Sequence, residues 1–170
     1  MRKEMVVLRH STKDMVLTGM GIALVFVATL INIKLPIGQG GLIHLGNVPL
    51  FLFAIIYGKK IGAVAGAFGM GLFDLMGGWT PWAPATFIIV GLMGYTVGVI
   101  AEKKDDLTGY TLAIILACAI KVAGYYVAEA LIYGNWVQPV LSVPGNLMQI
   151  AVAAVIVLPL AKNLKKALRR

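Results

Sequence analysis

The stretch from Ile120 to Trp136 reads IKVAGYYVAEALIYGNW and contains the end of a long apolar run. That run extends from Leu107 to Tyr133, and its only charged residues are a lysine and a glutamate. A helix needs about 20 residues to cross the hydrocarbon core, so the run is long enough to span a membrane. Polar side chains recur in it at intervals of four: Lys121, Tyr125, Glu129 and Tyr133. Because this spacing places them on one helical face, we expect a spanning helix with one polar stripe.

The rest of the chain is also apolar and poor in charged residues. Of its 170 residues, 59% are hydrophobic and only 13% are charged, and soluble domains carry about 25% charged residues. Three further segments contain no charge and are each long enough to span: Met15–Ile33, Ala83–Ala101 and Val143–Ala161. The sequence therefore predicts an integral membrane protein with at least four spanning helices.

The region between Leu45 and Met76 is less regular. Leu45–Tyr57 and Ile61–Met76 are apolar but short, and Lys59 and Lys60 lie between them. Together they predict a helical hairpin whose first helix is short or tilted. The expected fold is thus an all-α integral membrane protein: six transmembrane helices in one compact bundle, forming a single domain over residues 1–170.

The net charge of +8 is distributed unevenly. With six helices, 13 of the 15 basic residues fall on one side of the membrane. They are Arg2, Lys3, Arg9, Lys13, Lys59, Lys60, Lys103, Lys104, Lys162, Lys165, Lys166, Arg169 and Arg170. This positive-inside pattern predicts that both termini, a segment of residues 1–13 and a basic tail of residues 162–170, are cytoplasmic. The charge orients the protein, and we expect no nucleic-acid partner.

Glycines recur at helical spacing in two of the expected helices. Gly58, Gly62 and Gly66 are four residues apart, and a second set comprises Gly91, Gly94 and Gly98. Small residues on one stripe let helix backbones approach closely in a membrane. We interpret both stripes as packing surfaces inside the bundle.

Polar and aromatic residues gather in the outer half of the expected bundle, near the connections 34–46, 77–82 and 134–142. The candidate substrate-binding residues are Gln39, His44, Asn47, Asp74, Trp79, Trp82, Lys121, Tyr125, Glu129, Tyr133, Asn135, Trp136, Asn146 and Gln149. Charges inside a membrane are costly and usually face an internal cavity, which favours a binding site. In the alternative interpretation, the tryptophans anchor the membrane interface, and His44 or Asp74 caps a helix.

The residue types indicate what such a site holds. Aromatic rings can enclose a flat heterocycle, while amide, imidazole and carboxylate groups bond its polar edge. The sequence contains no Cys/His metal-ligand spacing, no nucleophile elbow and no phosphate-binding loop. We therefore predict no catalytic residue, no metal and no cofactor.

Two segments resemble a known family. GGLIHLGNVPLFLFAIIYGKKIGAVAGAFGMGLFDLMGG (Gly40–Gly78) and WAPATFIIVGLMG (Trp82–Gly94) are similar to the substrate-binding S components of energy-coupling factor (ECF) vitamin transporters. The likeness is to the riboflavin-type S components, in particular members assigned to hydroxymethylpyrimidine or pyridoxine. Where that family often has Gly-Asp after His-Leu, this chain has Gly46-Asn47.

The resemblance implies a six-helix, multi-pass protein of the cytoplasmic membrane with a vitamin pocket near the outer face. The implied partners are the vitamin, membrane lipid, a transmembrane T component and two cytoplasmic ATPases. Family members contact the T component through Ala-x-x-x-Ala in the first helix, and Gly19 and Ala23 occupy these positions here. On this basis the chain is a vitamin-binding transport subunit and not an enzyme.

Two other functions are compatible with an embedded polar stripe. A self-contained channel or secondary carrier could use Lys121, Glu129 and Asp74 as an ion or proton path, but the inverted repeat typical of carriers is not visible. A membrane enzyme acting on lipid or quinone would need a nucleophile, a metal cluster or a matched acid–base pair. The sequence offers none of these.

Overall fold

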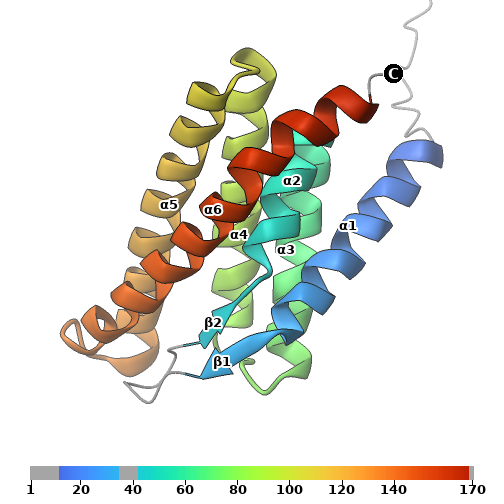
Figure 1. Ribbon diagram of the computed structural model, residues 1–170. Helices are drawn as coiled ribbons and strands as arrows, with labels where there is room; N and C mark the ends of the chain where they lie inside the picture. Colours follow the sequence, from blue (N-terminus) through green and yellow to red (C-terminus); the bar gives the residue numbers. More distant parts are fainter. Residues whose placement is uncertain (1–11, 35–41, 169–170) are drawn as a thin grey trace, which may run out of the picture.

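The computed structural model describes residues 12–34 and 42–168 (Figure 1). In chain order its elements are α1 (Thr12–Leu30), β1 (Asn32–Lys34), β2 (Leu42–His44), α2 (Asn47–Tyr57), α3 (Lys59–Met76), α4 (Ala83–Lys103), α5 (Leu107–Tyr133), η1 (Gln138–Ser142) and α6 (Val143–Leu168). The helices form the bundle expected from the apolar runs, and α3 packs between α1 and α4.

Four helical segments in the described residues are long and apolar enough to cross a membrane. They are Thr12–Leu30, Ala83–Lys103, Leu107–Tyr133 and Gln138–Leu168. Helix α2 is apolar but has only 11 residues, which agrees with the prediction of a short helix in the hairpin. At about 1.5 Å per residue, α5 with its 27 residues extends about 40 Å.

The first connection differs from the predicted loop. The expected helix Met15–Ile33 ends at Leu30, and the next residues form strand β1. This strand pairs in antiparallel fashion with β2, with Asn32 opposite His44 and Lys34 opposite Leu42. The short hairpin places His44 close to the start of α2, which begins at Asn47.

A single residue joins α2 to α3. Gly58 has φ +90°, a conformation that residues with a Cβ rarely adopt. The chain therefore reverses at the predicted position, immediately before Lys59 and Lys60. The side chain of Lys59 forms an ion pair with Glu102 of α4 at 2.8 Å, which connects this turn to the end of a neighbouring helix.

The glycine stripes pack the helices α2, α3 and α4 together, as predicted. A Cβ on Gly62 would lie 2.6 Å from the Ala54 Cα atom of α2. A Cβ on Gly94 would overlap the backbone of Gly62, and one on Gly98 would overlap the backbone of Lys59. Larger residues at these positions would force the three helices apart.

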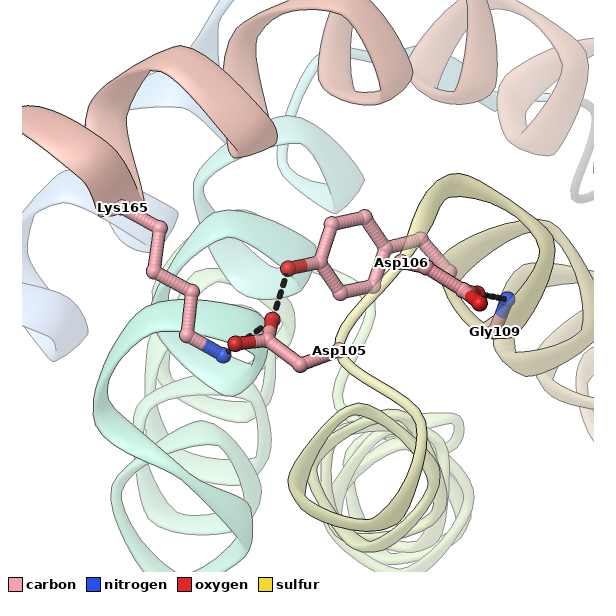
Figure 2. Close-up of polar contacts among 5 residues, drawn as sticks. Asp105, Asp106, Gly109 and Lys165 are labelled. Atoms are coloured by element: carbon pink, nitrogen blue, oxygen red, sulfur yellow. Dashed lines mark hydrogen bonds and ion pairs between the residues drawn. The ribbon is translucent and has the colours of Figure 1, made fainter.

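The two ends of the bundle carry different connections (Figure 1). The β1–β2 hairpin, the α3–α4 connection and the α5–α6 connection lie at one end, and the α4–α5 connection lies at the other. At that other end Asp105 accepts hydrogen bonds from Tyr110 and from Lys165 of α6 (Figure 2). Asp106 caps α5 by accepting a bond from the Gly109 N–H at 2.6 Å. These contacts hold the end of α6 against the α4–α5 connection.

Candidate functional site

A polar cavity lies at the end of the bundle that carries the β1–β2 hairpin. It has a volume of about 50 Å³ and is lined by Leu42, His44, Asp74, Trp79, Trp82, Lys121, Tyr125, Glu129, Asn146 and Gln149. Nine of these ten residues belong to the set of binding residues predicted from the sequence. The elements β2, α3, α5 and α6 and the α3–α4 connection surround the cavity, so residues far apart in the chain meet there.

One wall of the cavity is the polar stripe of α5. Lys121 and Glu129 are 1% and 2% exposed, although both carry charged groups. The Lys121 Nζ atom lies 5.0 Å from the centre of the Tyr125 ring, within the range of a cation–π contact. The buried charges therefore face the cavity, as the cost of burying them in lipid predicts.

A chain of hydrogen bonds links three helices behind that wall. The Thr86 hydroxyl donates to Asp74 Oδ2 at 2.5 Å, and the Tyr125 hydroxyl lies 2.9 Å from the Thr86 oxygen. Because Thr86 has a single hydrogen, which it gives to Asp74, Tyr125 is the donor in the second bond. The carboxylate of α3 and the phenol of α5 are thus held in place by one threonine of α4.

Histidine and amide groups form the opposite wall. His44 Nδ1 accepts a hydrogen bond from the Gly46 N–H at 3.2 Å, so its proton is on Nε2. Burial, followed by the positive charge of Lys121, lowers the pKa of His44 well below its ordinary value of 6.5. Gln149 donates to the Leu42 carbonyl and accepts from Asn47 Nδ2 at 3.4 Å. This bond places Asn47 behind Gln149, outside the cavity lining.

Aromatic rings close the cavity on the side of the α3–α4 connection. The ring centres of Trp79 and Trp82 are 5.5 Å apart, and those of Trp82 and Tyr133 are 5.9 Å apart. Both pairs are edge-to-face, the favoured arrangement for aromatic side chains. Tyr133 therefore contributes to the site through Trp82, one helical turn beyond Glu129.

Asn135 and Trp136 do not line the cavity, and a third predicted residue is not among those that the structure describes. Gln39 lies outside the described residues. Asn135 and Trp136 are exposed in the α5–α6 connection, where Asn135 Oδ1 accepts a bond from the Val137 N–H and the Trp136 carbonyl accepts one from Tyr126. Their contacts are those of a loop, so the structure does not support placing them in the pocket wall.

Two residues near the site were not predicted from the sequence. Thr86 positions Asp74 and Tyr125, yet a single threonine in an apolar helix has no distinctive sequence signal. Leu42 contributes through its position in β2, a three-residue strand that is too short for a recognisable alternation. No group of three or more His, Cys, Asp or Glu side chains suited to a metal occurs in the part of the chain that the structure describes.

A second hollow lies at the opposite end, between α1 and α3. This groove has a volume of about 660 Å³, and Gly19, Ile22 and Val64 are among the residues that line it. Gly19 and Ala23 are both exposed, and a Cβ on Gly19 would meet no atom within 4 Å. By contrast, a Cβ on Gly21 would lie 2.8 Å from Ala65 Cβ. Gly19 thus leaves open space on α1, and Ala23 is exposed one turn later.

The family described as "ECF-type riboflavin transporter, S component" matches residues 9–166. A solved structure described as the S component of a bacterial ECF transporter superposes with a TM-score of 0.75. It covers 93% of this chain and 98% of its own at 21% identity, and this likeness shows the fold alone.

Curated relatives span much of the same length. The thiamine precursor transporter HmpT of Lactococcus lactis is 29% identical over 93% of this chain and 89% of its own. An uncharacterised protein of Pyrococcus woesei is 30% identical over 66% of this chain and 74% of its own. The chain belongs to the S component family of ECF-type riboflavin transporters, and it is accordingly a multi-pass transport subunit of the cytoplasmic membrane and not an enzyme.

Proposed function

We propose that this protein captures a small aromatic vitamin or vitamin precursor, hydroxymethylpyrimidine or pyridoxine, at the outer face of the membrane. A T component and two ATPases then drive its delivery into the cell. The observation that carries this proposal is the cavity in which buried Lys121 and Glu129 meet aromatic and amide side chains. The relative named as a thiamine precursor transporter supports a pyrimidine-sized cargo, and the family name by itself does not select riboflavin.

The distribution of charge supports placing the cavity at the outer face. Lys59, Lys60, Lys103 and Lys104 lie at helix ends remote from the cavity, as do the basic residues at the end of α6. Positively charged connections favour the cytoplasmic side. This distribution supports our proposal of six spans with both termini in the cytoplasm.

The groove between α1 and α3 is the surface that we assign to the T component. A helix with exposed small residues lets a partner helix approach closely, and such contacts drive association where lipid removes the hydrophobic contribution. Gly19 offers open space, and Ala23 follows one turn later on the same helix. Gly19 lines the groove, and it is also one of the two positions that the family resemblance gives for contact with the T component.

The cavity is smaller than most sites that bind small molecules. Small-molecule sites usually measure about 300–1,000 Å³, whereas this cavity measures about 50 Å³. Binding therefore has to displace wall side chains outward. Trp79 and Trp82 line the cavity from the α3–α4 connection and its junction with α4, so we expect their environment to change when the vitamin binds.

The test is to identify and titrate the bound molecule. Mass spectrometry of small molecules released from the purified protein should find hydroxymethylpyrimidine or pyridoxine. Adding that compound to ligand-free protein should change the tryptophan fluorescence in a saturable way. Absence of any flat heterocycle from the extract, together with no response to a panel of such vitamins, would contradict the proposal.

Reconstitution separates this function from a carrier. In vesicles the protein alone should give no net uptake, and uptake should require the T component, both ATPases and ATP. Uptake by the protein alone would favour the carrier that uses Lys121, Glu129 and Asp74.

A further inference from the structure

Two buried polar atoms have no hydrogen-bond partner among the described residues: Asn47 Oδ1 and Glu129 Oε2. Both are acceptors. Glu129 lines the cavity and is only 2% exposed, so water does not freely satisfy its oxygen. Buried acceptors in native proteins almost always have a donor, and an unpaired one at a binding site indicates a donor that the ligand supplies.

The neighbours of Glu129 define what kind of donor fits. The Trp82 and Ser142 side chains lie close enough to the carboxylate to donate hydrogen bonds to it, and the Ser142 hydroxyl also lies 2.9 Å from the Pro139 carbonyl oxygen. Glu129 Oε2 is nevertheless left without a partner, so this atom lacks a donor that a ligand can supply. An aromatic amino group can donate an N–H to such an acceptor, whereas an oxo group has no hydrogen to donate.

The deeper end of the same wall presents hydrogen-bond donors in place of acceptors. Lys121 lies two turns from Glu129 on α5, about 12 Å along the axis, and it carries three donors. No described residue accepts a hydrogen bond from it, and its ammonium instead lies over the Tyr125 ring. The wall therefore fits a molecule that has an amino group at the edge near Glu129. At the edge near Lys121 it fits an acceptor, such as a hydroxyl or ring nitrogen.

We propose that Glu129 selects an aromatic heterocycle bearing an exocyclic amino group, and that it rejects the same ring when an oxo group replaces the amine. This inference rests on the proposed function and chooses within it: hydroxymethylpyrimidine carries such an amine, and pyridoxine does not. An oxo group would set its oxygen against Glu129 Oε2, leaving two acceptors opposed without a hydrogen between them.

The experiment compares two ligands that differ at one group. Calorimetric titration of ligand-free protein would use 4-amino-5-hydroxymethyl-2-methylpyrimidine and its 4-oxo counterpart. We expect the wild type to bind the amino compound at least tenfold more tightly. Equal affinity for the two compounds, or tighter binding of pyridoxine, would overturn the inference.

A matched pair of variants tests whether Glu129 is responsible. The amide of Glu129→Gln has both a donor and an acceptor, so it can bond either compound, and the preference should fall to within about threefold. Glu102→Gln makes the same change at the far end of α4 and should keep the wild-type preference. A Glu129→Gln protein that retains the full preference would show that another residue makes the selection.

The outcomes also distinguish this inference from the proposed function. Binding of pyridoxine or riboflavin without binding of the aminopyrimidine would refute the selection by Glu129 and leave the vitamin-binding role intact. Binding of none of these compounds would refute both.

Discussion

At the scale of single residues, His44 makes the site sensitive to acid. Its Nδ1 atom accepts the Gly46 N–H, so protonation breaks this bond and adds a positive charge near Lys121. Because the pKa of His44 is lowered in the folded state, the unfolded chain binds more protons below pH 6.5. Stability from this residue is complete above that pH and falls as the pH decreases below it, by at most about 1.4 kcal/mol per unit.

Thermal unfolding of the purified protein between pH 7.5 and 5 would measure this effect. We expect the midpoint to decrease below about pH 6.5, and His44→Asn, which keeps an acceptor for Gly46, should decrease less. An identical pH profile in the two proteins would show that other groups titrate.

The same scale shows what the sequence could predict about the site. The spacing of Lys121, Tyr125 and Glu129 identified one wall, because charges buried in an apolar helix need a cavity. Trp136 was expected at the site, yet it is exposed and paired with Tyr126. Sequence alone does not tell an aromatic residue that lines a pocket from one that stays in a loop at the same depth.

At the scale of elements, α1 presents two glycines with opposite surroundings. Gly19 faces the open groove, and Gly21 faces Phe53 and Ala65. We expect Gly19→Leu to leave vitamin affinity and folding of the isolated protein unchanged but to block its co-purification with the T component. Gly21→Leu should instead destabilise the isolated protein by about 1–3 kcal/mol through overpacking.

Thermal unfolding, vitamin titration and pull-down of the T component on both variants would provide the comparison. If Gly19→Leu still assembled, or lost vitamin binding together with assembly, the groove would not be the docking surface.

Helix positions were predictable because long apolar runs without charge have few alternatives in a membrane protein. The predicted bounds of α5 agree with the structure, and α4 extends two residues beyond the predicted Ala101. The strands β1 and β2 were not predicted, since three residues are too few for a period of two to be recognised. Their pairing depends on contacts between segments, which local sequence does not encode.

At the scale of the whole molecule, the orientation in the membrane can be tested with single cysteines. Cys118 is the only cysteine, so Cys118→Ala gives a background without thiols. Added to this background, Thr80→Cys should react with an impermeant maleimide on intact cells, because its loop adjoins the cavity. Lys104→Cys, in the exposed α4–α5 connection, should react only after permeabilisation. The reverse pattern would place the cavity in the cytoplasm.

Helix α3 borders both hollows of the molecule. Asp74, near one end, lines the cavity, and Ile61 and Val64, near the other, line the groove. If vitamin occupancy alters the docking equilibrium by some factor, thermodynamic linkage requires docking to alter vitamin affinity by the same factor. A coupling module that binds the loaded subunit tenfold more tightly would thus also make the subunit hold its cargo tenfold more tightly. In the transport cycle that we propose, release into the cell would then have to draw on ATP, because the docking equilibrium by itself would favour retention.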